Sequence, residues 1–376
     1  MYKSKLLFLI ILLIFSLFVI NANADVYNEQ LDASGAVQLF NDLPNNVRES
    51  LDNLGVVDLD WKSLSNISID KILSEVTKLS SIYIRKPLRA ISVCLGIILL
   101  CALMDSFKDS FSSKPLSGLI NAVSSLCICI SIVNPVVKCL SNAGNVLKYS
   151  STFMLSYIPI ISCVMASTGQ ALSSIAYQTT MMTFNEVLFK LSSEFIIPLV
   201  YIILAINIVS SISPRLNLSR IPDVSYKIIN KLLVAIVSIF SIILTLQNII
   251  SSSADSIGQK AVKAMIGSLI PVVGSAVSGA FSTVYGYVNL LKSSIGAFGI
   301  VAILFIFLPI VIECSMWSLS LNVCVIIGSI FDLPQVSNMV KGIIKSLNIM
   351  IAIIFSSAII MIISTSLIFI SGGMTN

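Results

Sequence analysis

Apolar residues recur in long runs from residue 88 to the C-terminus, separated by short polar segments. Each run approaches the roughly 20 residues with which a helix crosses a bilayer. The pattern therefore predicts an all-α, polytopic helical membrane protein. The expected multispan part is 87–376. Its expected spans are 88–104, 116–137, 151–167 (interrupted by Pro159), 195–212, 232–250, one within 261–317 and one in 346–370. The less apolar segment 170–191 is expected to cross or re-enter the membrane.

The first residues have the layout of a secretory signal peptide. Lys3 and Lys5 precede a short apolar run, and Ala22 and Ala24 frame a small-residue cleavage site, so residues 1–24 are interpreted as the signal peptide. An uncleaved signal anchor is the alternative. In either case the following segment is expected outside the cytoplasm.

Residues 25–86 form the one segment with a soluble composition, and they are acidic. We expect a small helical extracytoplasmic domain in which Trp61 packs between short amphipathic helices. An apolar stripe at helical spacing is expected to pack on this domain or on the membrane surface, with docking of a partner as the alternative. The stripe consists of Ile69, Ile72, Leu73, Val76 and Leu79.

Two basic loops indicate the topology and an internal repeat. The segment 214–231 holds four cations against Asp223, and 332–345 holds Lys341 and Lys345, so the positive-inside rule places both in the cytoplasm.

Similar motifs recur 111 or 112 residues apart. Pro159 pairs with Pro271, Pro198 with Pro309 and Pro222 with Pro334. We therefore expect two parallel repeats, 115–221 and 222–333, separated by an even number of crossings.

Prolines and small residues mark a candidate core in the apolar stretch 261–317. Small residues three or four positions apart share one helix face and allow helix backbones to approach closely. Proline removes a backbone donor and can break a helix, which in a bilayer requires burial in protein or contact with water. A packed helical hairpin and a broken helix beside a conduit both fit. The candidate positions are Pro159, Gly267, Pro271, Gly274, Ser275, Ser278, Gly279 and Pro309.

Composition supports the membrane class and limits the chemistry. Hydrophobic residues make up 56% of the 376 positions and charged residues 11%, well below the roughly 25% of soluble domains. The net charge of +5 is spread among loops, so we expect no nucleic-acid partner. The chain has no histidine and no Walker, nucleophile-elbow or kinase motif. We therefore expect no enzymatic activity, no metal and no cofactor.

The eight cysteines lie in or beside apolar segments and form no C-x-x-C pair. We interpret them as small buried apolar residues rather than ligands. They are Cys94, Cys101, Cys127, Cys129, Cys139, Cys163, Cys314 and Cys324.

Four charged residues fall at membrane depth. Glu186, Lys190 and Glu194 recur every four residues and share a helix face, and Glu313 stands alone in an apolar run. Ionisable groups inside a membrane are costly, so they are candidate functional residues. The alternatives are an interfacial helix for the first three and a position near the membrane surface for Glu313.

Several motifs resemble one known family. The run Ser251-Ser252-Ser253-Ala254-Asp255, the run from Gly267 to Gly274 and the segment Leu290 to Gly296 are similar to stage III sporulation protein AE. The resemblance implies an endospore former and the mother-cell membrane around the forespore. It also implies a channel or secretion-like complex that includes an ATPase, other membrane proteins and ring-forming proteins, and it supplies no catalytic residues.

Two functions from different classes follow. The first is a non-enzymatic membrane subunit of the sporulation channel, in contact with the lipid bilayer and with the other subunits; self-association is left open. The second is a stand-alone permease for a small solute, favoured by the repeat and the charges at membrane depth. An intramembrane hydrolase is a distant third.

Overall fold

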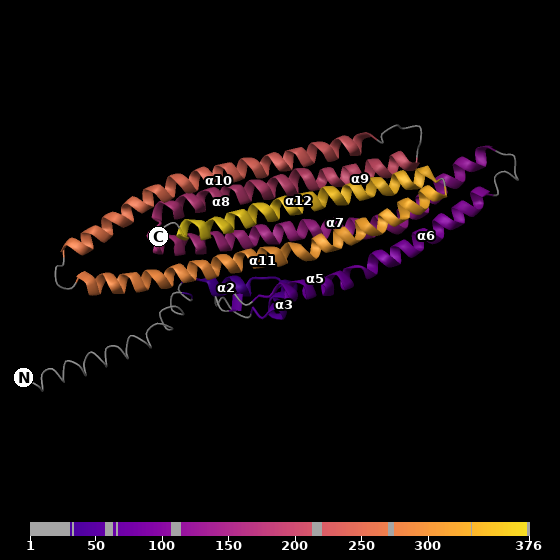
Figure 1. Ribbon diagram of the computed structural model, residues 1–376. Coiled ribbons are helices and arrows are strands. Elements are labelled where there is room, and N and C mark those ends of the chain that lie inside the picture. The colour runs from indigo at the N-terminus through magenta and orange to yellow at the C-terminus, as the bar shows by residue number, and fades with distance from the viewer. Residues whose placement is uncertain are drawn as a thin grey trace, which may run out of the picture.

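Long helices lying side by side along one axis make up most of the protein (Figure 1). The computed structural model describes residues 31, 34–56, 63–64, 67–106, 114–212, 220–269, 274–331 and 333–373, and this part of the chain contains no strand. The all-α class is therefore confirmed. The elements are α2 (Ala36–Asn41), α3 (Asn45–Leu54), α5 (Ile69–Tyr83), α6 (Arg85–Ser106), α7 (Lys114–Ser167), α8 (Ala171–Lys190), the π-helix η2 (Leu191–Ile196), α9 (Ile197–Ile212), α10 (Arg220–Leu269), α11 (Gly274–Ile330) and α12 (Pro334–Gly373).

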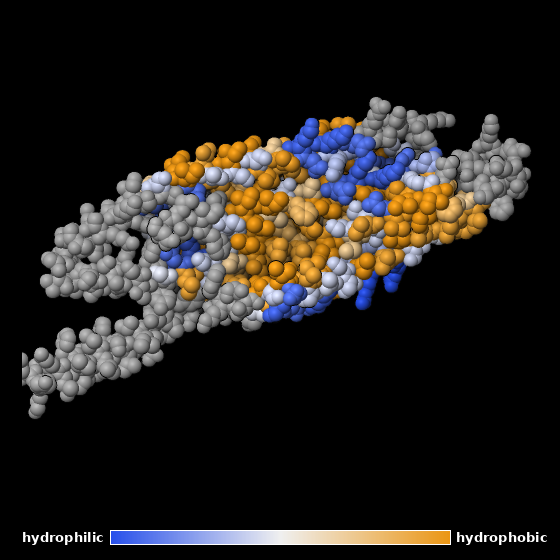
Figure 2. Space-filling view, viewed as in Figure 1, coloured by the Kyte–Doolittle hydropathy of each residue, from blue (hydrophilic) through white to orange (hydrophobic). Residues whose placement is uncertain are grey.

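Six helical runs in the described residues are long and apolar enough to cross a membrane, which makes this a multi-pass membrane protein. They are Ile69–Met104, Leu126–Ser167, Ala171–Ser210, Ile221–Asp255, Val288–Ile330 and Pro334–Ser366. At 33 to 43 residues, each exceeds the roughly 20 residues needed to span the hydrocarbon core. Apolar side chains cover much of the visible surface, with a polar patch toward the right-hand end of the view (Figure 2).

The expected separation of spans 116–137 and 151–167 is wrong, because both lie in the single helix α7. The polar residues between them suggested a loop. Hydroxyl groups can instead bond a carbonyl of their own helix, and Ser150 Oγ donates to the Leu147 carbonyl oxygen at 2.8 Å. The Asn185 side chain of α8 also donates to the Ser151 carbonyl oxygen at 3.0 Å. Polarity in this stretch therefore serves contacts between and within helices.

Segments 170–191 and 195–212 likewise form one run, because η2 joins α8 to α9 without a turn. The less apolar segment thus shares a span with its neighbour. Each expected repeat then covers two antiparallel runs, α7 with α8–α9 and α10 with α11. The C-terminal ends of α9 and α11 lie at the same end of the bundle (Figure 1). This is the placement a parallel repeat requires, although the repeat itself stays a prediction.

The candidate prolines do not break helices where they are described. α7 continues through Pro159 and α11 through Pro309, because neighbouring helices and local adjustment can compensate for one missing backbone donor. The broken-helix expectation is therefore wrong at these two positions. Pro271 lies outside the described residues. Gly267 in α10 and the candidate residues Gly274, Ser275, Ser278 and Gly279 in α11 are described only as parts of their helices, so the packing expected at these positions stays a prediction.

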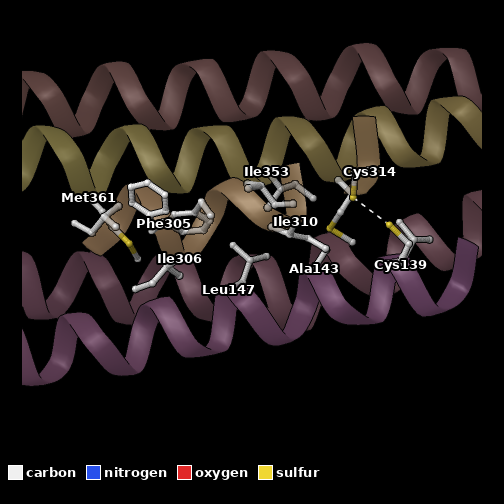
Figure 3. Packing of buried hydrophobic residues seen from close by; sticks show 14 of the residues in the cluster. Cys139, Ala143, Leu147, Phe305, Ile306, Ile310, Cys314, Ile353 and Met361 are labelled. Atoms are coloured by element: carbon white, nitrogen blue, oxygen red, sulfur yellow. Dashed lines mark hydrogen bonds between the residues drawn. The ribbon is translucent and has the colours of Figure 1, made fainter. Parts of the chain in front are cut away.

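Helix α11 is the most buried of the six candidate spans, and it packs against α12, α7 and α6. Residues four positions apart on α7 face residues four positions apart on α11: Cys139, Ala143 and Leu147 lie opposite Ile306, Ile310 and Cys314 (Figure 3). In a bilayer such interdigitation, rather than exclusion of water, holds helices together.

The N-terminal boundary expected at residue 86 falls inside a helical run. The Leu88 amide donates to the Ile84 carbonyl oxygen at 3.0 Å, so α5 continues into α6. The expected apolar stripe is only partly covered, since Ile69 and Leu73 are exposed. Ile72 of the stripe packs against the apolar core. α5 also makes a buried polar contact, because Glu75 accepts a hydrogen bond from Ser50 Oγ of α3 at 3.0 Å. Residues 1–24 and Trp61 lie outside the described residues.

We expect Gly342→Ala to destabilise the contact between α9 and α12. A Cβ at residue 342 would lie 2.4 Å from the Asn207 side chain, whose amide donates to the Gly342 carbonyl oxygen at 3.2 Å. The cost should be about 1–2 kcal/mol, because the amide can rotate at the price of its hydrogen bond. Thermal unfolding in detergent measures it. Gly96→Ala, which meets nothing within 4 Å, is the control, and equal midpoints for the two variants would contradict the contact.

Candidate functional site: a cationic cavity and a buried polar cluster

The charged face of α8 points away from the bundle. Glu186 and Lys190 form an ion pair of 2.7 Å, and their side chains are 63% and 59% exposed. Glu194, in η2, is also exposed. Functional charges in membrane proteins usually face the bundle interior or a water-filled cavity. The structure therefore separates these three residues from Glu313, and their exposed ion pair contributes little stability.

Glu313 is buried and lies at the wall of a cavity of about 700 Å³ between α6, α7 and α11. Trp317, one helical turn further along α11, lies in the same wall. The Asn142 side chain of α7 faces the Glu313 carboxyl group. The cavity thus has a deep wall that combines a carboxylate, an amide and an aromatic ring.

Cationic side chains from two helices line the same cavity as this carboxylate. Arg85, Lys86 and Arg89 come from the start of α6, and Lys138 comes from α7. All four are exposed, whereas Glu313 is the one acid of the lining. Such an arrangement can hold an anionic group. The three α6 cations were not among the expected site residues; their clustering within five residues of the sequence was the available signal.

A second polar group lies at the turn between α7 and α8. Gly169 has a φ of 74°, which favours glycine, and it ends α7. The buried carboxylate of Asp255, on α10, accepts hydrogen bonds from the Leu172 amide at 3.0 Å and the Ser173 amide at 2.9 Å. These amides belong to the first turn of α8, where backbone donors lack partners within the helix. Asp255 therefore caps a helix to which it does not belong.

Helix α11 reaches the same turn through Lys292. Its ammonium group donates to Gln170 Oε1 at 2.9 Å, and the lysine is only 2% exposed. Asp255, Gln170 and Lys292 thus form a buried polar cluster. It joins α7, α8, α10 and α11 at the 168–170 turn. Its residues were not among the expected site residues, because nothing in the sequence indicates that Asp255 and Lys292 meet at the 168–170 turn.

The thiols of Cys139 and Cys314 are in contact between α7 and α11. Their sulfur atoms are 3.3 Å apart and buried. Among the described residues, no group of three or more His, Cys, Asp or Glu side chains could hold a metal ion.

Comparison with known proteins identifies the family of this chain. The stage III sporulation protein AE family matches residues 59–372, which is most of the chain. The chain belongs to the stage III sporulation protein AE family. The resemblance found in the motif runs is thus confirmed, and two of those runs contain Asp255 and Lys292.

Stage III sporulation protein AE of Bacillus subtilis (strain 168) is 21% identical to this chain over 210 residues, which cover 55% of this chain and 53% of the relative. The aligned part thus spans about half the length of the curated relative. No solved structure matches the chain.

Proposed function

We propose that this protein is a non-enzymatic, integral membrane subunit of the channel or secretion-like complex between mother cell and forespore. The observation that carries the proposal is the family match over residues 59–372 in a chain whose described part holds six candidate spans. In this proposal the protein lies in the mother-cell membrane around the forespore, with its N-terminal segment outside the cytoplasm. Its partners are the ATPase, the other membrane subunits and the ring-forming subunits of the complex.

The way buried charges are used supports a scaffolding role. Asp255 and Lys292 both bond the α7–α8 turn, so they fix the relative position of helices. The candidate spans are also longer than the bilayer core requires. Such helices extend beyond the hydrocarbon region and offer protein surface for contacts with other subunits.

Deletion of the gene tests this proposal. We expect sporulation to arrest after engulfment and to be restored by the intact gene, with at least a hundredfold difference in heat-resistant spores. The tagged protein, solubilised from sporulating cells, should bring down the other subunits of the complex. Normal spore yield in the deletion strain would refute the proposal.

A stand-alone permease is the second candidate, and the 700 Å³ cavity lined by charged residues favours it. Liposomes containing only this protein distinguish the two functions. The subunit proposal predicts no flux of small solutes above that of empty liposomes, and selective flux would favour the permease.

A further inference from the structure

Four cations from α6 and α7 line the cavity between α6, α7 and α11. Lys78, Lys190 and Lys345 each pair with a carboxylate. Within the described residues, Arg85, Lys86, Arg89 and Lys138 form no such ion pair, although they line one cavity. With Glu313 as the single acid of the lining, positive side chains are in clear excess. The cavity is therefore suited to an anionic ligand.

Arginine makes phosphate the most suitable anion. A guanidinium group can donate two parallel hydrogen bonds to phosphate oxygens. Arg85 and Arg89 are four residues apart on α6, so they lie on one helix face, and both line the cavity. Lys138 of α7 adds a charge from a second helix of the lining.

The apolar part of the lining distinguishes a lipid from a free anion. Ala90, Val93, Pro135 and Trp317 also line the cavity, and inorganic phosphate would gain nothing from them. Val93 is 48% exposed, and beyond it Leu99 and Leu100 of α6 are exposed as well. This strip lies on a candidate span, so acyl chains can lie along it while the headgroup enters the cavity. Tryptophan is typical of the level at which headgroups lie.

We propose that the α6–α7–α11 cavity binds the phosphate group of an anionic phospholipid. Arg85, Lys86, Arg89 and Lys138 contact the phosphate, and the exposed apolar residues of α6 contact the acyl chains. The volume of about 700 Å³ accommodates a headgroup, since small-molecule sites commonly measure about 300–1,000 Å³. Basic cavities between membrane helices are known to take anionic headgroups. Glu313, on the deep wall, repels the phosphate and limits the affinity.

Native mass spectrometry of the full-length protein in detergent tests this site. Phosphatidylglycerol should remain bound at concentrations at which phosphatidylcholine is lost. The triple variant Arg85→Gln, Lys86→Gln, Arg89→Gln should bind phosphatidylglycerol at least tenfold more weakly, because each cation near a membrane surface contributes roughly a fivefold factor. Lys148→Gln is the control. It removes an exposed cation of α7 that does not line the cavity, and it should leave binding unchanged.

Glu313→Gln should have the opposite effect and bind phosphatidylglycerol several-fold more tightly. This test does not depend on whether the triple variant folds. Unchanged or weaker binding in Glu313→Gln, or equal retention of both lipids by the unaltered protein, would overturn the proposal. So would displacement of phosphatidylglycerol by an equal concentration of inorganic phosphate, which would assign the site to a soluble anion. None of these readouts depends on the role in sporulation.

Discussion

Asp255→Ala is expected to lower the free energy of unfolding by about 3–6 kcal/mol, because two hydrogen bonds to a charged group are lost at about 1.5–3 kcal/mol each. The Leu172 amide, in a partly buried position, and the buried Ser173 amide would be left without their acceptor. The reactivity of the buried thiols Cys94 and Cys324 toward a fluorogenic maleimide during heating in detergent would measure the loss.

Asp223→Ala is the matched control for this variant. Asp223 is also on α10, but its carboxylate is exposed and pairs with Lys345 at the surface. Exposed ion pairs contribute at most about 1 kcal/mol. Asp255→Asn, which keeps one acceptor oxygen, should fall between the two. If Asp255→Ala unfolded at the same temperature as Asp223→Ala, the capping role of Asp255 would be wrong.

Gly299→Ala is expected to destabilise the bundle by about 3 kcal/mol, near the upper end for overpacking of a core. A Cβ at residue 299 of α11 would lie 2.6 Å from the ring of Tyr157. That ring is fully buried and is stacked on Phe153, so it has little room to move. Loss of thermal stability, together with a changed near-ultraviolet circular dichroism signal, would report the displaced tyrosine.

Gly286→Ala, on the same helix, is expected to change the stability in the opposite direction. Nothing lies within 4 Å of a Cβ built at residue 286, and alanine favours a helix over glycine by up to about 1 kcal/mol. We therefore expect this control to be neutral or slightly stabilising. A loss of stability equal to that of Gly299→Ala would show that the close approach of Tyr157 is not the cause.

Hydropathy and helix length allowed the class of this protein to be predicted, because a helix is the simplest way to satisfy backbone groups in lipid. The number of separate helices was harder to predict. The polar residues around Ser150 suggested a loop, yet their side chains bond carbonyls inside α7. Pro159 suggested a break, but the helix continues through it. A single sequence does not show which polar groups find partners on neighbouring helices.

The candidate site was predicted only in part. Glu313 was singled out by its isolation in an apolar run, and it does line the charged cavity. Glu186 and Lys190 were singled out as charges at membrane depth that share a helix face, but they pair on the exposed surface, because spacing along a helix does not reveal which face is buried. Asp255 and Lys292 were missed as site residues. Their meeting at one turn depends on the packing of four helices, which local patterns do not contain.

The central claim is that α7 crosses the membrane once and that the ends of α9 and α11 lie on the same side. Single cysteines at Ser167, Arg220 and Phe331, in a protein lacking the exposed Cys127 and Cys163, test it through labelling by an impermeant maleimide in intact cells. We expect Ser167→Cys to label from outside, and Arg220→Cys and Phe331→Cys to label only after permeabilisation. Labelling of residues 167 and 220 from the same side, or of 220 and 331 from opposite sides, would contradict this arrangement.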